Sequence, residues 1–101
     1  MLDRSSPLTY DWSSFSVSTG ETDYDVRDSI AALFSNVPYA RHCVIFFNKA
    51  LSVKFNNTGM PAIVMGISRS PFQSPLDFLE VHDIFITNAS GDSATVEVLL
   101  W

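Results

Sequence analysis

Residues 94–101, ATVEVLLW, alternate between two sets of side chains, which predicts a β-strand because successive side chains of a strand point to opposite faces. One set is apolar throughout. The other set begins with Thr95 and Glu97 but ends with Leu99 and Trp101. If the first set faces the core, Leu99 and Trp101 point outward. The last strand of a domain is often an edge strand, so we expect an exposed apolar strand end that needs a cover.

The same reading finds short strands along most of the chain. Residues 51–56 (LSVKFN) alternate cleanly, whereas 41–48 (RHCVIFFN) and 62–67 (AIVMGI) are apolar runs, as expected of strands covered on both faces. Near the N-terminus the apolar phase changes at Ser13-Ser14, which predicts a bulge or bend between two short pieces. The predicted strands are residues 8–12, 15–17, 41–48, 51–56, 62–67, 80–88 and 94–101.

Turns and one ambiguous segment separate these strands. Residues 88–93 (NASGDS) predict a hairpin loop in which Gly91 is free to adopt positive φ. Residues 24–37 have helical spacing but end at a proline, so we expect one or two helical turns or an irregular crossover, capped by Asp25 or Asp28. The pattern as a whole predicts an all-β fold, an antiparallel β-sandwich or jelly-roll-like barrel with at most one short helix.

Length and composition set the organisation of the chain. For 101 residues we expect a flexible N-terminal arm over residues 1–7 and a single β-sandwich domain over residues 8–101. Charged residues make up only 17% of the chain and eight residues are phenylalanine, so large apolar side chains must be buried in the core or against a partner. A net charge of −5 with six scattered basic residues argues against binding to nucleic acid or an anionic membrane.

No targeting segment is visible in the sequence. The first ten residues, MLDRSSPLTY, lack the apolar stretch of a signal peptide, and no apolar run reaches the length of a membrane span. We therefore expect synthesis in a cytoplasm. Glycosylation sequons begin at Asn56 and Asn88, and without a signal peptide both are interpreted as turn chemistry.

Few residues offer candidate chemistry. His42 and His82 lie in predicted strands, where the neighbouring Cys43 and Asp83 point to the opposite face, so neither adjacent pair can share a metal ion. Cys43 lies in an apolar run and is expected to be a buried thiol. The chain has no nucleophile elbow and no glycine-rich phosphate loop. We predict that the protein is not an enzyme and uses no catalytic residue, metal or cofactor.

Residues 51–101 resemble a known class of proteins. The stretches LSVKFN (51–56) and SPFQSPLDFLEVHDIFITNASGDSATVEVLLW (70–101) resemble the C-terminal half of small virion structural proteins of tailed bacteriophages. The resemblance implies a non-enzymatic subunit of the virion, made in the host cytoplasm, that acts in capsid decoration or cementing, at the neck or in the tail. It implies partners that are copies of the chain itself, in a homo-oligomer, and other virion proteins.

Contact residues follow from the exposed apolar strand end and the aromatic residues near the N-terminus. The predicted contact residues are Trp101, Leu99, Trp12 and Tyr10. The alternative is a carbohydrate- or receptor-binding β-module of a phage tail. Its predicted ligand-binding residues are Tyr39, Phe72 and His82. A third reading, a small cupin-type enzyme, would need two histidines and a carboxylate on one inner face.

Overall fold

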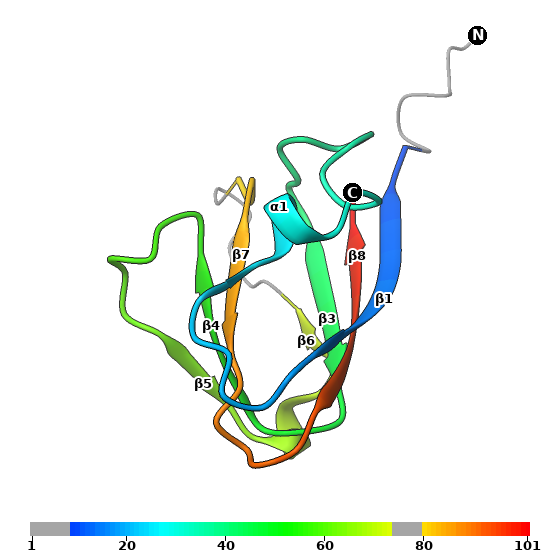
Figure 1. The fold of residues 1–101 in the computed structure, drawn as a ribbon. Helices are drawn as coiled ribbons and strands as arrows, with labels where there is room; N and C mark the ends of the chain where they lie inside the picture. Colours follow the sequence, from blue (N-terminus) through cyan, green and yellow to red (C-terminus); the bar gives the residue numbers. More distant parts are fainter. Residues whose placement is uncertain (1–8, 74–79) are drawn as a thin grey trace, which may run out of the picture.

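A computed structural model describes residues 9–73 and 80–101 as two four-stranded antiparallel sheets packed face to face (Figure 1). The order of strands is β1-β8-β3-β6 in the first sheet and β2-β7-β4-β5 in the second. The predicted all-β sandwich is thus confirmed. The arm predicted at residues 1–7 lies outside the described residues.

The strands are short, and the longest are the two that pair with each other. The first sheet contains β1 (Asp11–Val17), β8 (Ala94–Leu100), β3 (Cys43–Phe47) and β6 (Phe72–Gln73). The second sheet contains β2 (Tyr24–Asp25), β7 (Ile84–Thr87), β4 (Leu51–Phe55) and β5 (Ile63–Met65). The helix α1 (Val26–Ser29) follows β2, and a 3-10 turn (Ile67–Arg69) precedes β6.

The core lies between the two sheets and is built from alternate strand positions. Along β8 the buried residues are Ala94, Val96, Val98 and Leu100. They face the inward side chains of β4 and β7, which include Val53, Ile84 and Ile86. Each large apolar side chain buried in this way stabilises the fold by about 1.5–3 kcal/mol, so the alternation itself specifies which face of each strand points inward.

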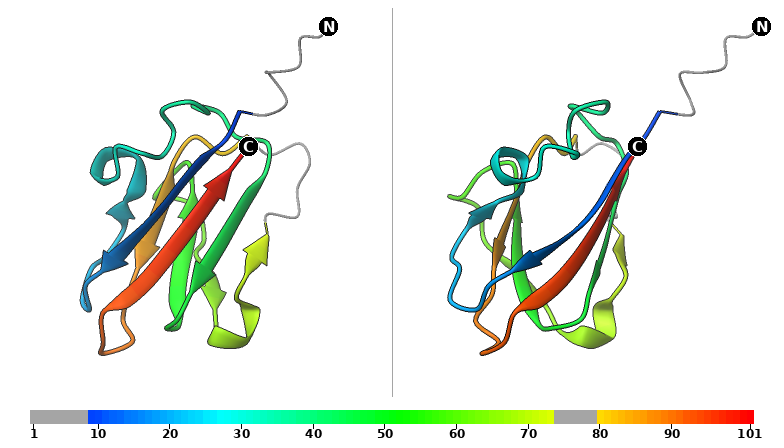
Figure 2. Two further views of the ribbon diagram at one scale, coloured as in Figure 1. Left: turned by 90° about the vertical axis from the view of Figure 1, so that its right-hand side faces the viewer. Right: turned by 45° about the vertical axis from the view of Figure 1, so that its right-hand side comes forward.

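β8 is a central strand, and the prediction that it forms an edge is wrong. It lies between β1 and β3, with Val98 opposite Ser13 on one side and Ile45 on the other (Figure 2). Position along the chain does not determine position in a sheet, because pairing depends on contacts between distant segments. Leu99 is therefore flanked by β1 and β3, and Trp101, which follows β8, bonds to His42 and Arg41 just before β3.

The apolar runs at 41–48 and 62–67 are covered on one face only, contrary to the prediction. In β3, Ile45 is fully buried whereas its neighbour Phe46 is 42% exposed. In β5, Val64 is 72% exposed. A two-layer sandwich leaves the outer face of each sheet open, and the described residues form no third layer above either sheet.

β1 passes through Ser13 and Ser14 with an unbroken register to β8, so the predicted bulge is absent from it. The apolar phase changes because a polar residue, Asp11, points inward at the start of the strand and is 3% exposed. Its carboxylate accepts hydrogen bonds from the backbone N–H groups of Asn36 and Val37, both at 3.0 Å. Asp11 thus occupies an inward position where the pattern predicts an apolar side chain, and its buried carboxylate is hydrogen-bonded to backbone N–H groups of the 35–37 loop.

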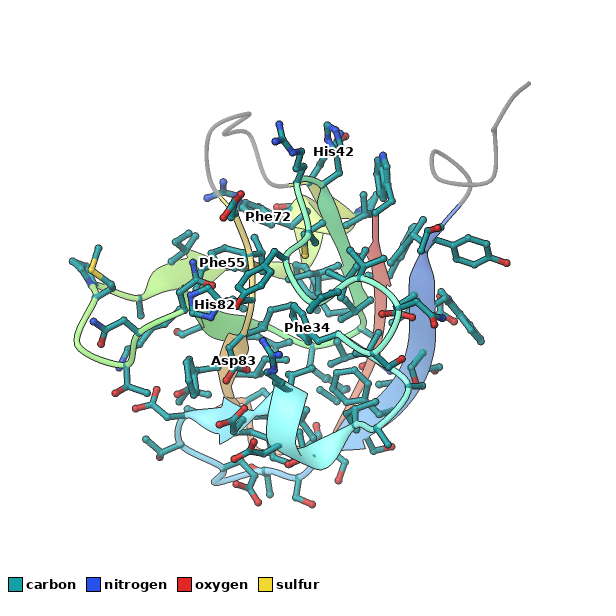
Figure 3. The ribbon with its side chains drawn as sticks, turned by 90° about the horizontal axis from the view of Figure 1, so that it is seen from above. Phe34, His42, Phe55, Phe72, His82 and Asp83 are labelled. Atoms are coloured by element: carbon teal, nitrogen blue, oxygen red, sulfur yellow. The ribbon has the colours of Figure 1, made fainter. Side chains whose placement is uncertain are left out.

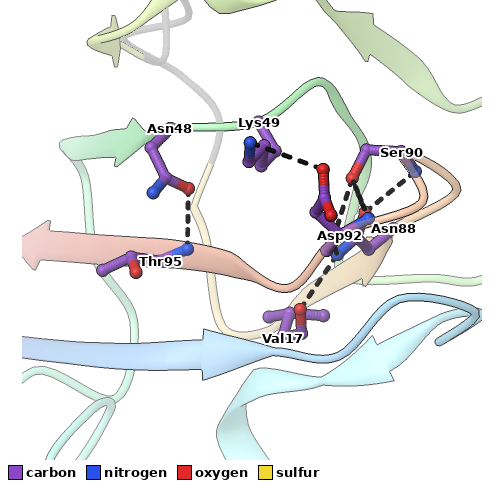
Figure 4. A network of polar contacts seen from close by, with 7 residues as sticks. All are labelled: Val17, Asn48, Lys49, Asn88, Ser90, Asp92 and Thr95. Atoms are coloured by element: carbon purple, nitrogen blue, oxygen red, sulfur yellow. Dashed lines mark hydrogen bonds and ion pairs between the residues drawn. The ribbon is translucent and has the colours of Figure 1, made fainter.

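The connection at 88–93 joins strands of different sheets, so it is not the predicted hairpin. Gly91 has the expected positive φ, at +93°. Asn88 is fully buried, and its side-chain amide donates to the carbonyl oxygens of Val17 at 2.9 Å and Asp92 at 2.8 Å (Figure 4). Its Oδ1 accepts from the backbone N–H and the hydroxyl of Ser90 at 3.0 and 2.7 Å. The sequon at Asn88 is turn chemistry, as predicted.

The segment after β2 begins with a single helical turn, where the sequence predicts one or two helical turns or an irregular crossover. Asp25 caps α1 by accepting a hydrogen bond from the backbone N–H of Asp28 at 3.2 Å. The chain then continues irregularly, burying Leu33 and Phe34. Within the described residues no helix has the length and hydropathy to cross a membrane.

Candidate interaction surface

The two outer faces of the sandwich differ in chemistry. The outer face of the second sheet is mixed: it carries Phe85 and Val64 beside Ser52, Thr87 and an ion pair between Lys54 Nζ and Asp23 Oδ1 at 3.2 Å. The outer face of the first sheet is dominated by large apolar side chains. We call this set the aromatic face. It comprises Tyr10, Trp12, Val44, Phe46, Leu99 and Trp101.

Strand register brings the aromatic face together. Trp12 on β1 lies directly opposite Leu99 on β8, and Leu99 lies directly opposite Val44 on β3. Directly opposite side chains on one face of a sheet have Cβ atoms about 5 Å apart, so these three form a continuous apolar row across three strands. Tyr10 precedes β1 in the same phase as Trp12 and is also exposed.

Trp101 closes one end of the aromatic face. Its ring stacks on that of His42, with ring centroids 4.9 Å apart and planes 18° apart. The backbone N–H of His42 donates to the Trp101 carbonyl at 2.9 Å, and the N–H of Trp101 donates to the His42 carbonyl at 3.1 Å. The indole is therefore held in place while 39% of the residue stays exposed. Its side chain needs no large rearrangement to meet a partner.

Glu97 brings one carboxylate to this face among the described strands. It lies opposite Ser14 on β1 and Phe46 on β3, and it is half-buried. Within the described residues its side chain makes no ion pair or hydrogen bond. A partner that covers Glu97 must offer a hydrogen-bond donor, since an unpaired buried carboxylate is costly.

The size of the aromatic face limits what it can do alone. Seven residues at about 3.3 Å each span about 23 Å, and three strands span about 14 Å, so the flat area is roughly 300 Å². Four polar residues, Ser14, Ser16, Thr95 and Glu97, occupy part of this area, so its apolar part is smaller. A specific protein–protein interface buries about 800 Å² on each partner, so such a contact would have to extend beyond this face.

The structure places all four predicted contact residues on the aromatic face. Trp12 is 53% exposed, and the half-buried Leu99 is its cross-strand partner. The sequence reasoning missed Val44 and Phe46, because it took the apolar run of β3 to be covered on both faces. The same signal that was used at residues 94–101 could have revealed them: apolar side chains at the strand positions that alternate with the buried ones.

The three residues of the ligand-binding alternative do not form one open cleft. Tyr39 is exposed and meets the ring of His82 edge-on, with centroids 5.9 Å apart. Phe72 is buried in β6 and stacks on Phe55 at 6.3 Å, and Figure 3 shows its position relative to His82. Only two of the three therefore remain available to a ligand.

Cys43 is buried, as predicted, and cannot serve as an accessible nucleophile. Burial raises the pKa of its thiol to about 12, so the sulfur stays protonated at neutral pH. No group of three or more metal-ligating side chains occurs in the part of the chain that the structure describes.

A carboxyl pair lies near the helix end of the second sheet. Burial, together with a hydrogen bond to the side chain of Asp25 and the charge of Asp25, raises the pKa of Asp83 to about 6, although two backbone hydrogen bonds lower it. Those contacts come from the N–H groups of Arg27 at 3.1 Å and Ile84 at 2.7 Å, both to Oδ1. Asp83 therefore holds its proton more readily in the folded state than in the unfolded chain.

Asp83→Asn is expected to raise stability at pH 7 by up to about 1 kcal/mol, a figure discounted because the carboxyl is only half-buried. The folded-state pKa lies above the ordinary 3.8, so the native state binds the proton more tightly. Its stabilising effect is complete below about pH 4 and is lost as pH rises through about 6. Urea unfolding between pH 4 and 7 should show this slope in the wild type and a flatter one in the variant. Asp92→Asn, which removes an exposed carboxylate 3.6 Å from Lys49, should keep the slope.

Comparisons of the chain with protein-family models, curated proteins and solved structures find no match. The resemblance of residues 51–101 to phage virion proteins therefore stays a prediction. The geometry provides the aromatic face on one sheet and a face of mixed polar and apolar side chains on the other.

Proposed function

We propose that the protein is a non-enzymatic assembly subunit, of the kind found in tailed-phage virions, that associates with copies of itself through the aromatic face. The carrying observation is the row formed by Trp12, Leu99 and Val44 across three strands, flanked by Phe46 and Trp101. The described residues provide no layer above it. Water-exposed apolar area of this kind gains free energy when a second surface covers it.

The residue types on this face suit a protein contact. Tryptophan and tyrosine are enriched among residues that dominate binding energy, and truncating such a residue often costs 2 kcal/mol or more. Trp12 and Trp101 already lie on adjacent strands and are held by backbone pairing. Because the Trp101 ring already stacks on His42, little of its side-chain freedom would be lost on binding, which favours association.

The carbohydrate-binding alternative, predicted at Tyr39, Phe72 and His82, is less well supported because Phe72 is buried. A sugar site on the aromatic face would have to use other rings. Sugars need polar groups placed around an aromatic platform, whereas the middle of this face is occupied by Leu99 and Val44. Glu97 is the one carboxylate that the described strands add to it. An apolar protein surface matches this composition better than a sugar does.

The test is the mass of the protein in solution. Wild-type protein should be oligomeric by light scattering, and Trp12→Ser combined with Phe46→Ser should weaken association about tenfold or more, equivalent to at least about 1.4 kcal/mol. Val64→Ser is the matched control, because Val64 is exposed on the outer face of the other sheet. Circular dichroism should show the same β signal in all three proteins.

A wild-type protein that stays monomeric at high concentration would contradict the proposal. So would an oligomer whose mass responds to Val64→Ser as strongly as to the double variant. Binding of the wild type on a glycan array, lost with Tyr39→Ala, would favour the alternative.

A further inference from the structure

β1 is the one long open edge in the described sheets. The outer strands are β1 and β6 in the first sheet and β2 and β5 in the second. β6 and β2 have two residues and β5 has three, whereas β1 has seven. Short edge strands protect a sheet from pairing with other chains, and a long regular one invites it. β1 contains no lysine, proline or bulge that would discourage pairing.

The backbone groups that β1 leaves open can be identified from the ladder. His42 and Trp101 exchange both backbone hydrogen bonds, so alternate residues of β8 starting at Trp101 bond to β3. The N–H of Thr95, in the same phase, points to the Asn48 side chain on that same side, at 2.8 Å. The remaining residues of β8 bond to β1. Because Val98 lies opposite Ser13, it is the odd-numbered residues of β1 that face β8.

Trp12, Ser14 and Ser16 consequently direct their N–H and C=O groups away from β8. Among the described residues no hydrogen bond uses these outward groups. A row of such groups spaced every second residue is the binding site for another strand, which would form about six hydrogen bonds with three residues.

A depression lies beside the first part of this edge. It has a volume of about 750 Å³ and lies between residues 9–12 on one side and Ala32, Ser35 and Asn36 on the other. Its lining includes Asp11 and Trp12, consecutive residues of β1 whose side chains point to opposite faces, so the depression lies along the first residues of the strand edge. The end of a strand paired with β1 would enter this space.

We propose that two copies of the chain pair antiparallel through β1, with Ser14 opposite Ser14 of the second copy on a two-fold axis. This register pairs all three open residues, placing Trp12 opposite Ser16 of the other copy and Ser16 opposite its Trp12. The partner's Ser16 and the residues after it lie toward the depression. This inference rests on the proposed function, because it specifies how the copies associate.

The sequence of β1 is complementary to itself in this register. Each large side chain meets a small one, since Trp12 faces Ser16 on the outside and Phe15 faces Ser13 on the inside. The only charge on the strand, Asp11, lies opposite Val17, and its carboxylate already accepts hydrogen bonds from the 35–37 loop. No like charges oppose each other, which is a requirement for antiparallel self-pairing.

Pairing through β1 would also enlarge the surface available for contact, which is too small on one copy for a specific protein–protein interface. Two four-stranded sheets would become one eight-stranded sheet, and both aromatic faces would lie on the same side of it. The combined outer surface of these strands, apolar and polar together, would be roughly 600 Å² before any further contact. Because the two-fold axis uses the same edge of both copies, the pairing closes at a dimer and does not extend into a fibre.

Ser14→Cys tests the register directly. Residues in a hydrogen-bonded antiparallel pair have Cα atoms about 5.5 Å apart, within the range of about 4.4–6.8 Å for disulfides. Mild oxidation should convert this variant mainly to a disulfide-linked dimer. Ser68→Cys, at an exposed position on the 3-10 turn, is the control and should stay largely uncrosslinked. Cys43 is buried and protonated in both proteins and does not compete.

Ser14→Pro is the second variant. Its N–H points outward, so proline removes no hydrogen bond to β8 but blocks the partner strand, and the dimer should weaken about tenfold or more with the β signal retained. If Ser14→Cys crosslinks no better than Ser68→Cys and Ser14→Pro keeps its mass, edge pairing is wrong. If the oligomer of the Trp12→Ser/Phe46→Ser variant is then smaller than that of the wild type, the proposed function is still supported. If Ser14→Cys crosslinks but the double variant keeps the mass of the wild type, edge pairing is supported and association through the aromatic face is wrong.

Discussion

Asn88→Ala is expected to lower the free energy of unfolding by about 3 kcal/mol, since each buried polar group left without a partner costs about 1–3 kcal/mol. The side chain joins the end of β1 to the loop that leads into β8, through its bonds to Val17 and Asp92. Its backbone N–H and C=O also bond to Glu21 and Gly20, at 2.9 and 2.8 Å. Alanine would remove the side-chain bonds and leave a small polar cavity. Urea unfolding monitored by circular dichroism measures the change.

The control is Asn57→Ala. Asn57 is exposed and its side chain accepts one local hydrogen bond, from the N–H of Gly59 at 2.8 Å. Its removal should change stability by about 0.5 kcal/mol or less, as is usual for exposed positions. Equal losses at both asparagines would mean that Asn88 does not connect the two sheets.

Ile45→Ala is expected to cost about 3–4 kcal/mol, the range for truncating a fully buried aliphatic side chain. Ile45 lies in the middle of β3, paired with Val98 on one side and Phe72 on the other, and has no exposed surface. The expected effect is large because the site is enclosed by both sheets and cannot collapse easily. Thermal or urea unfolding in dilute solution gives the value without a contribution from association.

Val44→Ala, one position earlier on the same strand, is the matched comparison. Val44 points to the aromatic face, so its truncation should cost about 1 kcal/mol or less in the monomer. Comparable losses at positions 44 and 45 would show that β3 is covered on both faces, in agreement with the apolar run but against the structure.

The strands could be predicted because their alternation is a local property. In residues 51–56 and 94–101, the alternate apolar positions predict which side chains are buried, even though the partner strands are unknown. The order of strands could not be predicted in the same way. Nothing within residues 94–101 shows that they pair on both sides, because the contacts that decide this come from residues 11–17 and 43–47.

The aromatic face was only half visible in the sequence. Leu99 and Trp101 stand out because polar residues precede them in the same phase. Val44 and Phe46 do not, because a side chain covered by a second sheet and one left open for a partner can be the same residue type. Asp11 led to the opposite error. Its carboxylate points inward and accepts a hydrogen bond from a loop about 25 residues away, so the pattern showed a change of apolar phase where the strand is regular.

The central position of β8 has a consequence for how the chain acquires its fold. Asp11 in β1 pairs with Leu100 in β8. The first sheet cannot form until β8 is present, because β8 lies between β1 and β3 and pairs with both. During synthesis, β1 is made first but can pair only after β8, the last strand, has been made. Such non-local pairing slows folding, since the entropy of closing a long loop is lost before contacts compensate for it. A ribosome-bound chain that ends before β8 would expose the inward side chains of both neighbouring strands, a state in which chaperone binding is favoured.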